Sequence, residues 1–213
     1  KYALLLNTDI IIHDSEIKNL EIEIEKLGNN FTLASPMTND LVDFIKNNRF
    51  DNYFNDHIPL FDTKKNITKV ELIKGCSLVV NLNKFNREDV FDNNYFFFFE
   101  EIDLCRKIKE KKENIYVFNQ IKINHRSAQS LNESFNEKYH NFRHWNFFWG
   151  RYYYFKKHYG VLYSFYKHIG KLIRFAFNII RYYFVSETLF KKNKYRFLGL
   201  LNSILNKKSI VSV

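Results

Sequence analysis

The hydrophobic positions of this chain change their spacing along its length, and each spacing predicts an element. Residues 2–6 form a short continuous apolar run, which is typical of a buried strand, and the polar residues 7–9 after it predict a turn. From residue 17 to 27 the apolar side chains recur every three or four positions. This spacing predicts a helix that ends at Gly28.

The next apolar segment completes a unit of strand, helix and strand. Asp14 or Ser15 can cap the helix, and residues 31–34 follow it as a second short strand that Pro36 stops. Residues 39–66 are rich in Asn and Asp and predict an irregular excursion. Strand character returns in four later segments, residues 70–73, 77–82, 115–118 and 121–123. We therefore expect an α/β fold, with a parallel sheet and helices on its faces.

An aromatic run that breaks directly into carboxylates lies between Tyr95 and Arg106. Glu100, Glu101 and Asp103 follow four consecutive phenylalanines, and the apolar residues after them return at helical spacing. The three carboxylates therefore fall in the first turn of a helix. The helix dipole stabilises an acid there by roughly 0.3–1 kcal/mol, so capping explains these residues as well as catalysis does.

From about residue 135 the pattern becomes helical, aromatic and basic. Wide apolar faces are interrupted by Lys and Arg, and no stretch is long and uncharged enough to span a bilayer. We therefore expect amphipathic helices that lie in a membrane interface. Trp145 and Trp149 suit an interfacial aromatic belt, although a helical subdomain packed on the sheet explains the aromatic residues of the first helix equally well.

Charge divides the chain at nearly the same place. The net charge is +10, yet residues 138–213 contain 15 Lys and Arg and a single acid, Glu187, while the residues before them carry a net charge of −4. A strongly basic tail favours an anionic partner, either nucleic acid or an anionic membrane surface. Bulky aliphatic side chains in helical stripes favour the membrane, because single-stranded nucleic acid is usually read by aromatic residues on an open sheet.

Length and composition favour one domain with an appendage. A chain of 213 residues with 46% hydrophobic content can bury a sizeable core. Cys76 and Cys105 lie in apolar segments rather than in a C-x-x-C pair, which indicates neither a disulfide framework nor a zinc knuckle and favours a reducing compartment. The chain enters a strand directly after Lys1 without the pattern of a signal peptide, so we expect a truncated sequence.

Polar residues follow two of the expected strands, where ligands bind in open α/β sheets. Asp9 follows the first strand and His125 ends a late one, so both project at carboxyl ends. An Asp and a His that converge can hold a divalent cation, and a nearby carboxylate can remove a proton. Gly75 permits a turn or a close approach of backbone to ligand. Taken singly, each residue has a structural explanation: Asp9 as a turn residue, His125 as a structural histidine and Gly75 as part of an ordinary bend.

The order of these motifs resembles the family 2 glycosyltransferases of the inverting GT-A fold, particularly rhamnosyltransferase-like enzymes of bacterial surface-polysaccharide assembly. Those chains typically show a strand ending in N-P-D or D-x-D, a strand ending near G-P and a G-containing strand pair. The motif F-F-x-Y-x-E-D-x-D-L-C-x-R and a strand leading to His, with Ser soon after, complete the series. The matching pieces, which cover roughly residues 2–130, are Leu4 to Asp9, Ala34-Ser35-Pro36, Lys74-Gly75-Cys76, Phe96 to Arg106, and His125 with Ser127 and Ser130.

The resemblance implies a donor site at the strand ends. Asp9, with Asn7 at the other acidic position, would help to hold Mg²⁺ or Mn²⁺ on the diphosphate of a nucleotide-sugar donor, and His125 would complete the metal site. Gly75 would let the backbone approach the donor. Asn7 departs from the family pattern, because it leaves a single carboxylate at that motif and so implies a weaker dependence on metal.

The resemblance also implies a general base in the carboxylate helix. Glu101 matches the aspartate that deprotonates the acceptor hydroxyl, and Glu100 and Asp103 flank it. Glutamate is a second departure, because its longer side chain moves the base by about one methylene, and catalysis depends sharply on such placement.

For the whole chain, the resemblance implies a partial GT-A, Rossmann-like mixed sheet flanked by helices in residues 1–134, followed by basic, aromatic, membrane-associated helices in residues 135–213. The activity would be transfer of a sugar, rhamnose by resemblance, to a saccharide or lipid-linked acceptor at the cytoplasmic face of the inner membrane, with no nucleic-acid partner. The half that binds the nucleotide base is missing from this sequence, so the fragment alone would be inactive. Two alternatives stay open: a nucleic-acid-binding protein, and a transferase-like protein without activity.

Overall fold

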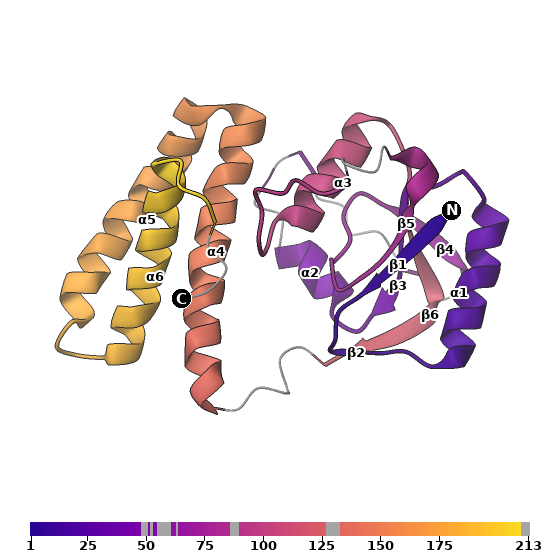
Figure 1. The fold of residues 1–213 in the computed structure, drawn as a ribbon, viewed down its shortest axis with the longest axis horizontal. Helices are drawn as coiled ribbons and strands as arrows, with labels where there is room; N and C mark the ends of the chain where they lie inside the picture. Colours follow the sequence, from indigo (N-terminus) through magenta and orange to yellow (C-terminus); the bar gives the residue numbers. More distant parts are fainter. Residues whose placement is uncertain are drawn as a thin grey trace. The chain divides into compact units, whose positions relative to one another are not determined.

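A computed structural model gives the fold of this chain (Figure 1). It describes residues 1–47, 51, 53–54, 61–62, 64–85, 90–126 and 133–209. The chain divides into two compact units. The sheet unit comprises Lys1–Phe91 and Glu101–Ser130, and the helical unit comprises Asp92–Glu100 and Leu131–Val213.

The sheet unit is built on an open, mixed sheet. Its strands are ordered β1 (Tyr2–Leu6), β5 (Ser77–Asn81), β3 (Leu33–Thr38), β6 (Ile115–His125) and β2 (Ile10–Ile11), and β4 (Ile67–Val70) also pairs with β6. β3 and β6 run parallel, whereas the other described pairings are antiparallel. The expected α/β fold with a mixed sheet is confirmed. A purely parallel sheet was the wrong expectation, because β5 lies between β1 and β3 and runs opposite to both.

Helices flank this sheet on both faces. Figure 1 shows α1 (Asp14–Leu27) on one face, and α2 (Leu41–Asn47) and α3 (Glu100–Glu110) on the other. A short 3-10 helix, Leu82–Lys84, follows β5. Leu20 and Ile24 of α1 are buried in a core cluster with side chains from β3, β5 and β6, so the apolar stripe that predicted this helix is the face it buries.

The ends of α1 follow ordinary capping chemistry. The helix begins after His13, whose backbone N–H donates a hydrogen bond of 2.8 Å to the Glu16 carboxylate, so neither Asp14 nor Ser15 is the cap residue. At the other end Gly28 has φ 53°, a left-handed conformation that glycine adopts without steric cost, as the sequence predicted.

Several strands differ from their predicted form, and the strand predicted at residues 70–73 is observed as β4, Ile67–Val70. β1 is an edge strand, and Leu4 is 38% exposed rather than buried, because β5 covers one edge of it only. β3 continues through Pro36 to Thr38, because its register with β6 shifts between Pro36 and Met37 and such an irregularity tolerates a residue without an N–H. Residues 115–118 and 121–123 belong to one strand, β6.

The aromatic run before α3 belongs to the helical unit. Tyr95 and Phe99 are buried, whereas Phe96 is 47% exposed, so the run is only partly a core element. Phe98 and Phe99 have φ values of 69° and 75°, which cost on the order of 1–3 kcal/mol each for residues of this size. Ring contacts of Phe99 with Phe147 and Tyr154 offset part of this strain.

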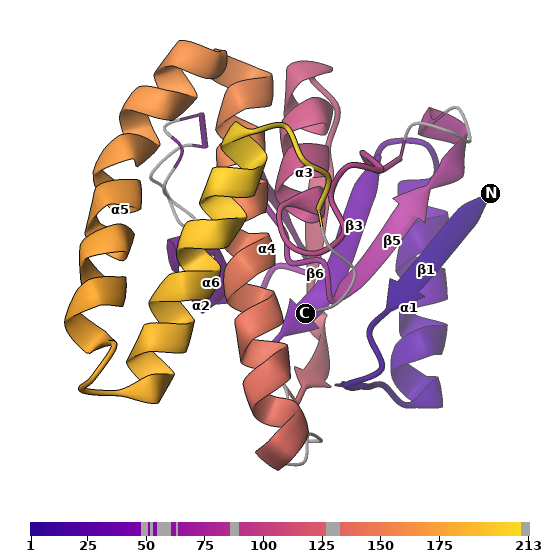
Figure 2. The same cartoon turned by 60° about the vertical axis from the view of Figure 1, so that its left-hand side comes forward.

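The helical unit is an arrangement of three successive helices that lie side by side (Figure 2). They are α4 (Glu133–Tyr159), α5 (Val161–Tyr182) and α6 (Glu187–Ile204). Gly160, with φ 88°, separates α4 from α5. Tyr152, Phe175 and Leu200, one from each helix, form the centre of the unit's core.

The two tryptophans of α4 lie inside this unit. Trp145 and Trp149 are 3% and 5% exposed, and the Trp149 indole N–H donates a hydrogen bond of 2.8 Å to the carbonyl of Lys207. The expected interfacial belt at these two residues was wrong, because their rings fill the helical core. In the described part of the chain, no helix combines the length and the apolar character that crossing a membrane requires.

Candidate functional site

His125 is the centre of a polar cluster at the carboxyl end of β6. The antiparallel pairing of Ile10 with His125 brings the preceding residue, Asp9, beside it. On the other side, the parallel register of β3 with β6 places Asn39 next to the main chain of His125, and the two residues exchange hydrogen bonds of 2.9 and 3.4 Å. Strand pairing therefore fixes the position of this histidine from both sides.

The His125 ring lies between two carboxylates. Its Nδ1 is 2.7 Å from Asp40 Oδ2, and its Nε2 is 3.2 Å from Asp9 Oδ2. The ring proton can occupy either nitrogen: Nδ1, where it faces Asp40, or Nε2, where it faces Asp9 while Nδ1 accepts from the Lys74 ammonium at 3.0 Å. With the proton on Nδ1, a neutral ring presents the lone pair of Nε2 to the Asp9 carboxylate, and two acceptors cannot satisfy each other. In that tautomer, a cation between Nε2 and Asp9 would satisfy both groups.

Lys74 supplies positive charge to the same cluster. Its ammonium group forms an ion pair with Asp40 and lies 3.0 Å from Nδ1 of His125. Burial alone would raise the pKa of Asp40, but the hydrogen bonds and charges of Lys74 and His125 outweigh it and lower that pKa to about 2. Asp40 is therefore ionised at neutral pH and orients both the ammonium and the imidazole.

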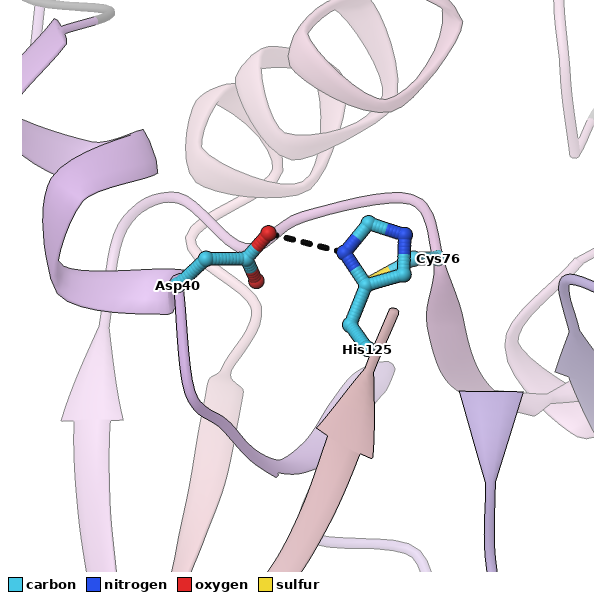
Figure 3. Close-up of side chains that lie close together, drawn as sticks. All are labelled: Asp40, Cys76 and His125. Atoms are coloured by element: carbon cyan, nitrogen blue, oxygen red, sulfur yellow. Dashed lines mark hydrogen bonds and ion pairs between the residues drawn. The ribbon is translucent and has the colours of Figure 1, made fainter. Parts of the chain in front are cut away.

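Cys76 completes the cluster with a thiol. Figure 3 shows it beside the His125 ring, opposite Asp40, and ligand atoms of these three residues lie within 4.8 Å of one another. Burial raises the pKa of Cys76 to about 12, so the group is a neutral thiol at physiological pH. For a soft metal to bind here, Cys76 would have to lose its thiol proton, and the metal would have to displace the ammonium group of Lys74 from Asp40.

The pair of Asp9 and His125 is the better match to a hard divalent cation. Asp9 Oδ1 is buried and has no hydrogen-bond partner among the described residues, so its lone pairs are available to a metal ion. Carboxylate oxygen suits Mg²⁺ and Mn²⁺, and an imidazole that donates its other N–H to a carboxylate is the usual form of a metal-bound histidine. Asp40 provides that carboxylate.

The turn Lys74-Gly75-Cys76 connects this cluster to the carboxylate helix. A Cβ placed on Gly75 would lie 3.4 Å from Cβ and 3.6 Å from Cδ of Glu101, which are ordinary contact distances, so the Glu101 side chain lies directly beside the turn. Asn7, which is exposed, donates its backbone N–H to the carbonyl of Cys76 at 3.0 Å. The turn therefore brings together the neighbourhoods of Asn7, Glu101 and His125.

The flanking carboxylates occupy different surroundings. The three acids lie in the first turn of α3, as predicted. Glu101 is 7% exposed, and Asp103 is 1% exposed with Lys107 Nζ at 3.9 Å from its carboxylate. Glu100 belongs to the helical unit, and burial raises its pKa. Ser127 and Ser130 lie outside the described residues.

Sequence reasoning missed Asn39, Asp40 and Lys74. Asn39 and Asp40 follow β3 directly, at the same edge of the sheet as His125, which is the signal that identified Asp9. The sequence places them in an irregular segment, because Pro36 predicts the end of the strand. Lys74 stands next to the glycine of a recognised motif, but its contact with Asp40 depends on the tertiary fold.

No family model, no curated protein and no solved structure matches this chain. Geometry and the order of the motifs are therefore the grounds for assigning a function.

Proposed function

We propose that this chain is part of an inverting glycosyltransferase. It would transfer a sugar from a nucleotide-diphosphate donor to a hydroxyl of a saccharide or lipid-linked acceptor in surface-polysaccharide synthesis. The observation that supports this function best is the approach of Asp9 to His125 at 3.2 Å, beside a turn whose Gly75 packs against Glu101. The proposed donor-binding and base residues thus lie around one short segment.

Each of these residues has a chemical task in such a reaction. Asp9 and His125 would hold Mg²⁺ or Mn²⁺, which supplies positive charge to the departing diphosphate. Lys74 lies in the same cluster and adds a second positive charge. Glu101 would accept the proton of the acceptor hydroxyl as that oxygen forms its bond to the anomeric carbon and the bond from carbon to phosphate oxygen breaks.

We also propose a place for this reaction, at the cytoplasmic face of the inner membrane, with the protein bound peripherally. Two observations support it. The described helices contain none that could cross a bilayer, and residues 138–213 are strongly basic. A lipid-linked acceptor would be presented at such a surface.

The test is release of nucleoside diphosphate from a panel of nucleotide sugars, including a rhamnose donor, by the gene product as the cell makes it. The assay is run with and without Mn²⁺ or Mg²⁺, and wild type is compared with Glu101→Gln. We expect release that depends on one donor, rises with metal and falls by a factor of about a hundred or more in the variant, because loss of a general base typically costs that much.

Glu110→Gln is the matched control, because Glu110 lies on the same helix but is 45% exposed and pairs with Arg106 at 2.9 Å. Its turnover should equal that of wild type. Full turnover in Glu101→Gln would remove Glu101 from the mechanism and direct attention to Glu100 and Asp103. No turnover with any donor, when acceptor lipids and sugars are also supplied, would favour a transferase-like protein without activity.

A further inference from the structure

The outer face of α5 carries an unbroken apolar stripe. Its members recur every three or four residues from one end of the helix to the other, and they are Leu162, Tyr166, Ile169, Ile173, Phe177 and Ile180. Leu162 is 87% exposed and Ile180 is 77% exposed. Phe184, two residues after the end of the helix, continues the spacing and is 92% exposed. A soluble protein rarely leaves so much contiguous apolar surface in water.

The opposite face of the same helix explains its packing. Ser164, His168 and Phe175 are the buried residues of α5, and they face the core that α4 and α6 complete. The helix therefore packs its inner face against α4 and α6, while the side chains of its second apolar face lie outside the described helical core. This second face requires a partner other than the helical core.

Positive charge lies along one side of the stripe. α5 contains Lys167, Lys171, Arg174 and Arg181 and no acidic residue. At about 100° per residue, Arg174 and Arg181 lie roughly a quarter turn from the centre of the stripe. Lysine and arginine in this position keep their charged ends at the level of the phosphates when an apolar face enters a lipid interface.

The charge continues onto α6 through Arg196. Burial and the positive charge of Arg174 lower the pKa of Arg196, and its buried Nε has no hydrogen-bond partner in the described part of the chain. Burial and three neighbouring cations likewise lower the pKa of Lys171. Cations that crowd one another in this way favour an anionic ligand.

These charges also decide between possible partners. A second copy of the chain, docked on the same face, would place the cations of α5 opposite themselves without an acid on the helix to neutralise them. A nucleic acid would satisfy the cations but would leave Leu162, Ile173 and Ile180 in water. A bilayer with anionic lipids satisfies both the stripe and the cations.

We propose that the outer face of α5 is a membrane-binding surface for anionic phospholipid, with the stripe in the acyl boundary and Arg174, Arg181 and Arg196 at the phosphates. The helix would lie in the plane of the interface. This inference rests on the membrane location proposed above and is independent of the sugar-transfer reaction. It assigns the contact to α5 and leaves the tryptophans of α4 out of it.

The experiment is sedimentation of the purified full chain with vesicles of phosphatidylcholine alone and of phosphatidylcholine mixed with phosphatidylglycerol. We expect wild type to bind the anionic vesicles more tightly than the neutral ones. Ile173→Ser combined with Phe177→Ser should weaken binding by at least about tenfold, because two large apolar groups no longer enter the interface. Arg174→Gln combined with Arg181→Gln should weaken binding to anionic vesicles on the order of tenfold and remove most of the preference for them.

Two exposed residues elsewhere provide matched controls. Ile22→Ser on α1 removes a 49% exposed apolar side chain, and Lys138→Gln on α4 removes an exposed cation. Both variants should bind vesicles like wild type, and circular dichroism should show all variants to be folded.

Each other outcome overturns the proposal in a distinct way. Wild type that stays in the supernatant with anionic vesicles excludes both the surface and the membrane location, whereas the donor assay still tests the transferase. If the Ile173 and Phe177 variant binds vesicles as tightly as wild type, α5 is not the binding surface, although the membrane location still holds. A wild-type dimer that this variant converts to a monomer, without vesicle binding, identifies a second copy as the partner. Tight binding to single-stranded DNA that is equally strong in wild type and in the Ile173 and Phe177 variant identifies a nucleic-acid surface.

Discussion

A single histidine with a carboxylate on each side is the most informative residue of the site. Asp40 lies 2.7 Å from Nδ1 and Asp9 lies 3.2 Å from Nε2. When the ring proton is on Nδ1, Nε2 presents its lone pair to Asp9. Lys74 neutralises Asp40 and leaves Asp9 as the carboxylate that a cation would meet. In the proposed metal site, Asp40 would position His125 and would not itself be a ligand.

This arrangement predicts how substitutions change metal binding. Asp40→Asn should weaken Mn²⁺ binding by about tenfold to a hundredfold, because the imidazole loses the partner that fixes its orientation and tautomer. His125→Gln should abolish binding. The measurement is titration calorimetry with Mn²⁺ alone, and Asp43→Asn, an exposed carboxylate on α2, is the control that should bind like wild type.

Two results would contradict that prediction. Equal Mn²⁺ affinity of Asp40→Asn and wild type would show that Asp40 does not orient the ligand. Binding that appears in Lys74→Met but not in wild type would show that the ammonium group of Lys74 is itself the cation of the site. In that case the donor assay should proceed without added metal.

At the scale of elements, the close contact of α6 with α4 depends on one glycine. A Cβ added to Gly199 would overlap the carbonyl oxygen of Trp145 and lie 3.0 Å from its Cα. Both are main-chain atoms of a helix, so they cannot move aside as a flexible side chain can. Gly199→Ala should destabilise the helical unit by about 2–3 kcal/mol, measured by urea unfolding.

Gly170→Ala on α5 is the matched control for that measurement. The added Cβ meets no described heavy atom within 4 Å, and alanine favours a helix over glycine by up to about 1 kcal/mol. Its stability should equal or exceed that of wild type. If Gly199→Ala were as stable as Gly170→Ala, the two helices would have to lie farther apart than they do here.

The elements that the sequence predicted best are those defined by local spacing. α1 has the expected bounds to within a few residues and α3 begins at the predicted carboxylates, because each helix buries one stripe of its own residues. The sequence predicts that β3 stops at Pro36, whereas its continuation to Thr38 depends on pairing with β6, which is distant in the sequence. For the same reason Asp9 and His125 were found, each at an obvious strand end, while Asp40 was not.

For the tail, the pattern predicted amphipathic aromatic helices, but it did not predict which of their aromatic residues are buried. Tryptophan suits an interface and a core equally well, so Trp145 and Trp149 could not be assigned from sequence. The two tryptophans are only 3% and 5% exposed, whereas most side chains of the apolar stripe of α5 are exposed. The exposed face of an amphipathic helix depends on which of its faces pack against neighbouring helices. The spacing of apolar residues along the helix does not contain this information.

At the scale of the whole molecule, each unit is held in part by an acid whose pKa is low. In the sheet unit this acid is Asp40. In the helical unit it is Asp92, which accepts hydrogen bonds from Lys157 at 2.7 Å and from Tyr153 at 3.1 Å. Burial would raise the pKa of Asp92, but Lys157 and Asn94 lower it to about 2.

Both units should therefore lose stability in the same acid range. A carboxyl group whose pKa is 3.8 when unfolded and about 2 when folded stabilises the fold fully above the first value, and this contribution disappears as the pH falls through the second.

We expect Asp92→Asn to lower the stability of the helical unit by about 1–2 kcal/mol at neutral pH and to match wild type near pH 2. Thermal unfolding followed by circular dichroism at several pH values measures this, with Glu25→Gln, an exposed acid on α1, as the control. A difference between Asp92→Asn and wild type that stays constant down to pH 2 would mean that the hydrogen bonds of Asp92, rather than its charge, hold the segment before α3 to α4.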